Sequence, residues 1–277
     1  MTVTSAPDVV RSATRRGRAG WITILGRAGL VAKGVSYALV GYLALRLALG
    51  AGGQATSRQG ALATVASHQW GELLLVVLAL GFAAYALWRL AETIWPDGDD
   101  GFAKRTGKRI GTLGRAAIYA GLAYVALKIA FGSGGGQSQS GQARHATAHV
   151  LSWSYGTWIV GIAGACIVAA GIYNAYRAVS KTFTKRWDTS SMSAPARRWG
   201  ERTGVAGLLA RAVVFALIGA FIIKAAADYN PRDAIGIDGA LQKLAHQTYG
   251  EWLLGLTAAG LLAYAIFCLV EARYRRV

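Results

Sequence analysis

Six long apolar segments alternate with short polar segments along this chain. The first two are RAGLVAKGVSYALVGYLALRLALG and WGELLLVVLALGFAAYALWRLAETIW, and a glycine-rich polar loop separates them. Each holds roughly twenty apolar residues, which at about 1.5 Å per residue can cross a hydrocarbon layer of ~30 Å. The pattern predicts a transmembrane helical hairpin over residues 21–95, and it recurs over 110–179 and 205–277.

The three hairpins share charged and aromatic positions as well as apolar ones. Three first-helix positions recur in every copy: Lys33, Tyr37 and Arg46, then Arg115, Tyr119 and Lys128, then Arg211, Phe215 and Lys224. In the second helices, Glu72 and Glu92 recur as Glu251 and Glu271, whereas the middle copy has Thr157 and Arg177. Three copies with a period of ~80–100 residues predict three structural units of one kind.

Two short motifs carry a family resemblance. The first, R-x-G-x-x-A-[KR]-G-x-x-Y, is formed by Arg27, Gly29, Ala32, Lys33, Gly34 and Tyr37. The second, G-A-L-x-x-x-A, is formed by Gly60, Ala61, Leu62 and Ala66 and again by Gly239, Ala240, Leu241 and Ala245. With these motifs the chain resembles the bacterial membrane proteins of domain of unknown function 1206, over about Arg27–Arg273. The middle copy departs from the pattern, with Gly114 and Ala116 in the first motif and no G-A-L. The resemblance implies three tandem two-helix units and brings no activity.

The net charge of +17 would suggest nucleic acid as a partner if the chain were soluble. Most of the 30 Lys and Arg residues, however, lie at alternate ends of the expected helices, in 11–33, 89–115, 177–211 and 273–276. The other ends hold only Arg46, Arg58, Lys128, Arg144, Lys224, Arg232 and Lys243. This is the positive-inside bias, so we expect both termini in the cytoplasm and no nucleic-acid partner. The resemblance to a bacterial family implies that the membrane is the bacterial inner membrane.

The expected fold is an all-α integral membrane protein of six transmembrane helices. Because each unit has an even number of spans, all three hairpins share one orientation, which favours a pseudo-threefold bundle around an axis along the membrane normal. Residues 1–20 form a basic cytoplasmic tail, retained because no cleavage site follows; it either lies on anionic lipid or acts as a disordered topology signal. Cytoplasmic linkers cover 96–109 and 180–204, and short amphipathic helices are expected in the outer loops of the first and third copies.

The recurring cations predict either ion pairs within a hairpin or an anion site. In an antiparallel hairpin, each cation of the first helix lies at about the same membrane depth as one acid of the second helix. This gives four candidate structural ion pairs: Lys33–Glu92, Arg46–Glu72, Arg211–Glu271 and Lys224–Glu251. In the middle copy, Arg115, Lys128 and Arg177 have no acidic residue at the matching positions. These three are either boundary residues that extend to the interface or the binding site for an anion, which is a phospholipid head group or a solute.

Other residues give no catalytic signal. The sequence lacks G-x-S-x-G, a P-loop, H-E-x-x-H and C-x-x-C, so we expect no enzyme and no cofactor. Cys166 and Cys268 differ by ~10 Å in expected depth and should not form a disulfide. His145 and His149 are one helical turn apart, a metal-binding spacing, but polar loop histidines are far commoner and no metal site is predicted.

Two functional hypotheses remain. The first is a non-catalytic accessory, scaffold or lipid-associating subunit, with a bilayer of anionic phospholipid and other membrane proteins as partners. The alternative is a channel or carrier for a small neutral or anionic solute along the pseudo-threefold axis. The expected midplanes carry hydroxyls and aromatic rings rather than the charges of ion-coupled transporters, which favours the first. A packed axis would argue against the second.

Overall fold

The computed structural model describes residues 6–50, 61–62, 71–94, 102–131 and 138–275, apart from the side chains of 6–20, 22, 92, 94, 102–108 and 110. This part of the chain is helical, with one isolated β-bridge between Trp187 and Arg275. Among the described residues, six helices are long and apolar enough to cross a membrane. The six long apolar helices that the sequence predicts are therefore confirmed, two in each repeat.

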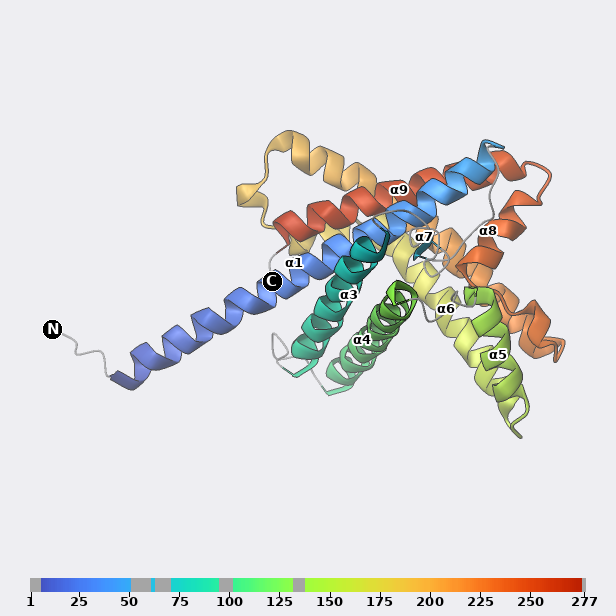
Figure 1. Ribbon diagram of the computed structural model, residues 1–277, viewed down its shortest axis with the longest axis horizontal. Coiled ribbons are helices and arrows are strands. Elements are labelled where there is room, and N and C mark those ends of the chain that lie inside the picture. Colours follow the sequence, from blue (N-terminus) through green and yellow to red (C-terminus); the bar gives the residue numbers. More distant parts are fainter. Residues whose placement is uncertain (1–5, 51–60, 63–70, 95–101, 132–137, 276–277) are drawn as a thin grey trace.

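Each repeat contains two long helices (Figure 1). The first repeat has α1 (Ala6–Ala48) and α3 (Gly71–Ile94), the second has α4 (Phe102–Ala130), α5 (Gln139–Leu151) and α6 (Gly156–Val179), and the third has α7 (Ala194–Ala227), α8 (Ile237–Ala245) and α9 (Gly250–Tyr274). Short 3-10 turns, η1 (Thr182–Arg186) and η2 (Thr189–Ser191), precede α7, and η3 (Pro231–Asp233) follows it. The short helix predicted in the third copy is α8. Its counterpart in the first copy lies mostly outside the described residues.

Helix α1 is longer than a membrane requires. It begins at Ala6 and has 43 residues, or ~65 Å at 1.5 Å per residue. The segment predicted as a tail over 1–20 is thus, from Ala6, the first part of this helix, which extends away from the other helices in Figure 1. Pro7 does not prevent this, because the first turn of a helix tolerates proline.

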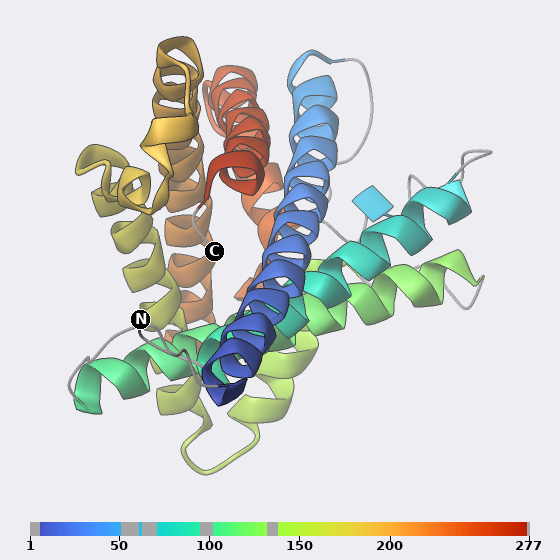
Figure 2. The same ribbon diagram turned by 90° about the vertical axis from the view of Figure 1, so that its left-hand side faces the viewer.

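The long helices pack in chain order. Helix α1 packs on α3, α3 on α4, α6 on α7, α7 on α9, and α9 returns to α1. This is the order expected for three hairpins around an axis, with one exception. Over their described residues, α4 and α6 do not pack along each other, and each lies instead on a neighbouring repeat (Figure 1, Figure 2). The hairpins are therefore not equivalent, and the pseudo-threefold bundle stays a prediction.

Glycines explain why the first and third hairpins close. A side chain on Gly29 would overlap Tyr85 across the α1–α3 contact, and one on Gly207 would overlap Tyr264 across the α7–α9 contact. These two contacts occupy the same positions of the repeat. In the middle copy the position of the tyrosine is Ala170, and no corresponding contact between α4 and α6 forms in the described part of the chain.

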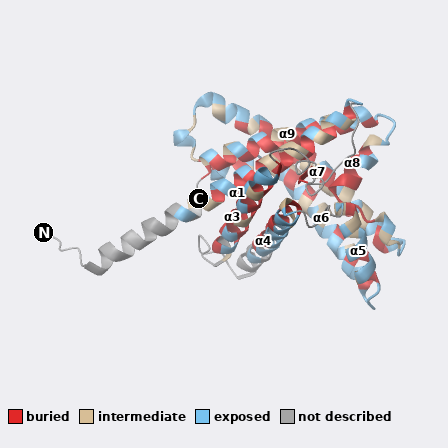
Figure 3. Ribbon diagram, viewed as in Figure 1, coloured by how far each residue is buried: buried red, intermediate tan, exposed pale blue. Residues whose placement is uncertain are grey.

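Two further contacts join the second repeat and the linker after it to the third repeat. Ser140 and Asp238, both buried, join α5 to α8 through a bond of 2.9 Å from the serine hydroxyl to the carboxylate. In the linker predicted over 180–204, Phe183 and Trp187 are buried beside Phe267 of α9. Two aromatic side chains therefore anchor the linker to α9, while most of its other residues are exposed (Figure 3).

Candidate functional site

Two motif cations of different repeats meet on one aromatic ring. The Nζ atom of Lys33 lies 5.1 Å from the ring centre of Tyr264 and 5.9 Å from that of Tyr85. The guanidinium carbon of Arg211 lies 4.6 Å from the ring centre of Tyr264, and its Nη1 donates a hydrogen bond of 2.5 Å to the hydroxyl. Tyr37 completes the group, with its ring edge-on to Tyr264 at 4.7 Å. We call Lys33, Tyr37, Tyr85, Arg211 and Tyr264 the tyrosine–cation cluster.

The repeat explains the convergence. Lys33 and Arg211 occupy one motif position, and Tyr85 and Tyr264 occupy one position of the second helices. Helix α4 adds the motif tyrosine of the middle copy, Tyr119, whose ring centre is 4.3 Å from that of Tyr85. Equivalent positions of all three repeats therefore supply the rings that surround the cations.

Positive charge exceeds negative charge in the tyrosine–cation cluster. Its five residues include two cations, neither of which forms an ion pair among the described residues, and the buried Nε of Arg211 has no hydrogen-bond partner there. The buried carboxylate of Glu271 lies two turns along α9 from Tyr264 and is directed to Arg275. Aromatic faces stabilise a cation by about 0.5–2 kcal/mol, much less than the cost of removing a guanidinium from water. An intramembrane cation held in this way favours an anion nearby.

Arg89 adds a third cation that the sequence analysis overlooked. Its side chain is buried, its Nη2 donates a hydrogen bond of 2.6 Å to the hydroxyl of Tyr85, and its guanidinium stacks on Trp88 at 4.3 Å. The signal was present, because Arg89 is the single basic residue of α3. It was missed because the repeat analysis looked for recurring cations, and the same position in the third copy is Cys268.

Two of the predicted ion pairs are replaced by other contacts. Arg211 does not pair with Glu271, since its guanidinium bonds to Tyr264, and the Glu271 carboxylate lies 4.0 Å from Arg275 one turn along α9. Desolvation by burial lowers the pKa of Arg275, and Glu271 opposes that shift. Lys224 does not pair with Glu251, because two nearer carboxylates take its ammonium, those of Asp228 at 2.7 Å and Asp233 at 2.9 Å.

The other two predicted ion pairs are left as predictions. The side chain of Glu92 lies outside the described part of the structure, so its pairing with Lys33 has no observation behind it. Arg46 and Glu72 are both described and both exposed. Even if these two meet, an exposed pair of this kind contributes at most about 1 kcal/mol.

The three cations of the middle copy do not form one site. Arg115 and Lys128 are both exposed on α4, thirteen residues or ~20 Å apart. Arg115 also donates a hydrogen bond of 2.8 Å from its Nε to the carbonyl oxygen of Gly111. Arg177 is half-buried near the C-terminal end of α6, whereas Thr157 lies near its N-terminal end. Of the three, only Arg115 and Arg177 lie at the same end of the spans.

The remaining candidates are quickly placed. Cys166 is exposed, Cys268 is buried and both are free, which confirms that they do not form a disulfide. His145 and His149 are exposed on α5. Within the described ranges, no three His, Cys, Asp or Glu side chains are grouped to hold a metal ion.

Comparison with known proteins identifies relatives. A family model described as Domain of Unknown Function (DUF1206) matches three times, over residues 28–95, 110–181 and 206–275. The chain is also 36% identical over 259 residues to a protein of Bacillus subtilis (strain 168) named Uncharacterized protein YxxB, covering 93% of this chain and 92% of that protein. No solved structure matches the chain. The three matches coincide with the three hairpins.

Proposed function

This chain belongs to the Domain of Unknown Function (DUF1206) family, and we propose that it is a non-catalytic membrane protein that associates with anionic phospholipid. We place it in the bacterial cytoplasmic membrane with both termini inside, on the strength of its basic helix ends. Its role is that of an accessory or scaffold subunit rather than of an enzyme.

The observation that carries this proposal is that Lys33 and Arg211 share Tyr264 while neither forms an ion pair among the described residues. Two like charges beside one ring repel each other, and the repulsion is strong in a medium of low dielectric constant. A phosphodiester group near this end of the bundle would reduce it. Arg115, exposed on the neighbouring helix, adds a cation that a lipid head group can reach directly.

The depth of the cluster is given by its own residues. Lys33 lies ten residues after the start of the apolar span of α1 at Thr23, and Tyr264 lies ten before the end of α9 at Tyr274, ~15 Å in each case. Figure 2 shows that α3 and α4 cross the other long helices steeply, so the ends of the helices do not by themselves mark one boundary. Long basic side chains at this depth can extend toward the membrane surface, where anionic lipid attracts basic residues by about 1 kcal/mol each.

Native mass spectrometry of the full-length protein tests the proposal. We expect it to retain phosphatidylglycerol in preference to phosphatidylcholine, and Arg211→Gln to reduce that preference by about threefold to tenfold, as the loss of ~1 kcal/mol or slightly more predicts. Arg211→Lys keeps the charge and should restore most of it. Lys243→Gln, at the opposite end of the spans, serves as the control. Equal retention of the two lipids by the wild-type protein would refute the proposal.

The alternative, a carrier for a small solute, requires a path along the bundle axis. Four buried tyrosines pack ring against ring at the cluster, Tyr37 on Tyr264 at 4.7 Å and Tyr85 on Tyr119 at 4.3 Å, which does not favour such a path. We expect no flux of small anions or of glycerol into liposomes that contain the purified protein. Flux that Arg211→Gln abolishes would favour the carrier instead.

A further inference from the structure

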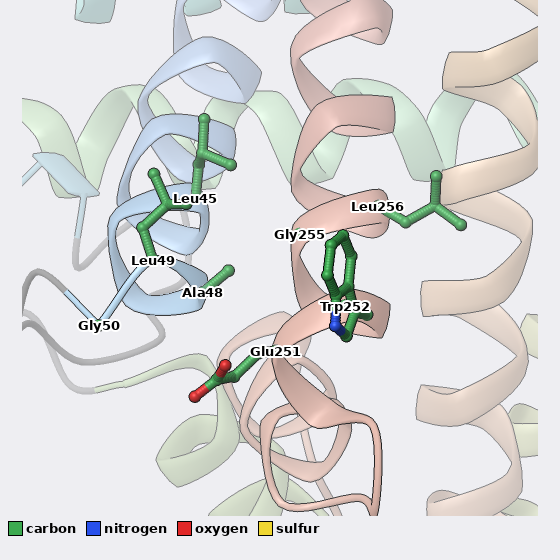
Figure 4. Close-up of a pocket in the computed structure, with 8 residues that line it drawn as sticks. All are labelled: Leu45, Ala48, Leu49, Gly50, Glu251, Trp252, Gly255 and Leu256. Atoms are coloured by element: carbon green, nitrogen blue, oxygen red, sulfur yellow. The ribbon is translucent and has the colours of Figure 1, made fainter.

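A groove lies between α1 and α9 at the end of the molecule opposite the tyrosine–cation cluster. Its volume is about 620 Å³, within the range of sites that hold a small ligand. Its walls come from the last turn of α1 and the first two turns of α9, as Figure 4 shows: Leu45, Ala48, Leu49, Gly50, Glu251, Trp252, Gly255 and Leu256. The contact between the two helices is close at its floor, where a Cβ on Gly255 would lie 3.7 Å from that of Ala48.

Among the described residues that line this groove, Glu251 alone has a charged side chain. In Figure 4 its carboxylate points toward the end of α1, away from Trp252 and Leu256. The cation expected for it, Lys224, is held by Asp228 and Asp233 at 2.7 and 2.9 Å. Among the described residues, Glu251 forms no ion pair. The groove thus combines apolar walls with a carboxylate that has no cationic partner in the described part of the chain.

The position of the groove determines where in the membrane a bound ligand would lie. The apolar span of α1 ends at Ala48, and that of α9 begins at Gly250, so Glu251 lies at a membrane boundary. Trp252, 81% exposed, has the location of an interfacial aromatic residue. A ligand with a head group at Glu251 would extend its apolar part along Leu45 and Leu49 toward the membrane interior.

We propose that this groove binds a membrane phospholipid with a primary ammonium head group, phosphatidylethanolamine. An ammonium group offers three N–H donors and a positive charge to the carboxylate, and charge-assisted hydrogen bonds of this type are among the stronger ones. A quaternary ammonium has no N–H to donate, and a glycerol head group has no positive charge. The proposal does not depend on the anionic lipid site, which lies at the opposite end of the molecule.

Competition between lipids in nanodiscs tests this inference. The full-length protein is placed in an equimolar mixture of phosphatidylethanolamine and phosphatidylcholine, and the bound lipids are counted by native mass spectrometry. We expect an enrichment of phosphatidylethanolamine of about twofold to fivefold, the size that one partly exposed charge-assisted contact allows. Glu251→Gln should abolish it, and Gly255→Leu, which fills the groove but leaves the carboxylate in place, should reduce the total lipid bound.

The first repeat provides the matched control. Glu72 occupies the same position of the second helix as Glu251 but does not line this groove, so Glu72→Gln should leave the enrichment unchanged. The inference fails if the wild-type protein shows no enrichment over phosphatidylcholine, or if Glu251→Gln retains it while the protein keeps its melting temperature. Because Arg211→Gln should not alter this enrichment, failure here is distinguishable from failure of the anionic lipid site.

Discussion

At the scale of single residues, the hydroxyl of Tyr264 is the critical partner of Arg211. Tyr264→Phe keeps the ring and its cation–π contact but removes the acceptor of the 2.5 Å hydrogen bond. A buried guanidinium that loses a partner should cost about 1–3 kcal/mol. We expect a lower melting temperature in detergent, and little change for Tyr173→Phe, whose side chain is exposed on α6. Equal melting temperatures would show that the hydroxyl contributes nothing.

The sequence predicted which residues matter better than it predicted their partners. Lys33 and Arg211 were identified because they recur, and both are central to the tyrosine–cation cluster. Their predicted partners were acids matched by depth, and depth contains no information about rotation around a helix. The face of α9 that meets α7 carries Tyr264, so the ring, and not Glu271, became the partner of Arg211.

At the scale of the helices, a methyl group on either packing glycine should separate a hairpin. Gly29→Ala and Gly207→Ala each place a Cβ on a tyrosine of the facing helix, where backbone as well as side chain is in contact. Overpacking of this kind costs about 1–3 kcal/mol. Gly114→Ala is the control, since nothing lies within 4 Å of its Cβ, and it should stabilise by up to ~1 kcal/mol through helix propensity. Melting temperatures in detergent measure all three, and equal effects would contradict the contact.

The α5–α8 junction offers a second test at this scale. The hydroxyl of Ser140 bonds to Asp238 and also accepts from the backbone N–H of Gly236 and Gly239, at 2.9 and 3.2 Å. Ser140→Ala leaves these groups without that partner, so hydrogen exchange should accelerate in α5 and α8. Ser152→Ala, exposed at the end of α5, should have no such effect. Unchanged exchange in Ser140→Ala would mean that apolar contacts alone hold the junction.

Helix α5 is an element that the spacing of apolar residues does not predict. The stretch Gln139–Leu151 is polar, with few apolar residues at helical spacing, so it reads as part of a flexible loop. Its helix depends on local and distant polar contacts: Ser138 caps the N-terminus by accepting from the N–H of Gly141, and Asp238 accepts from the N–H of Ser140. The second contact comes from the next repeat, 98 residues away, and no local pattern reports it.

At the scale of the whole molecule, the expected orientation can be tested directly. Lys185 lies in the basic linker after α6, and Arg232 lies in the turn after α7, at opposite ends of the spans. In a Cys166→Ala background, single cysteines at these positions should react with a membrane-impermeant reagent from opposite sides in intact cells and inverted vesicles. Labelling of both from one side would overturn the orientation. The distribution of Lys and Arg predicts Lys185 on the inner side.

The open middle repeat gives the last prediction. If all three hairpins were equivalent, Gly114 of α4 would face Cys166 of α6, because the same positions are occupied by the contacting residues Ala32 and Gly81 in the first repeat and Ala210 and Gly260 in the third. In the structure, nothing lies within 4 Å of a Cβ on Gly114, and Cys166 is exposed.

Gly114→Cys should therefore not form a disulfide with the native Cys166 under mild oxidation. The positive control is the double variant Ala48→Cys, Gly255→Cys with Cys166 replaced by alanine, where the Cβ separation of 3.7 Å suits a disulfide. Efficient cross-linking of Gly114→Cys with Cys166 would show that the middle hairpin closes like the other two. The pseudo-threefold bundle would then be complete, and the exposure of Arg115 that supports direct lipid contact would have to be reconsidered.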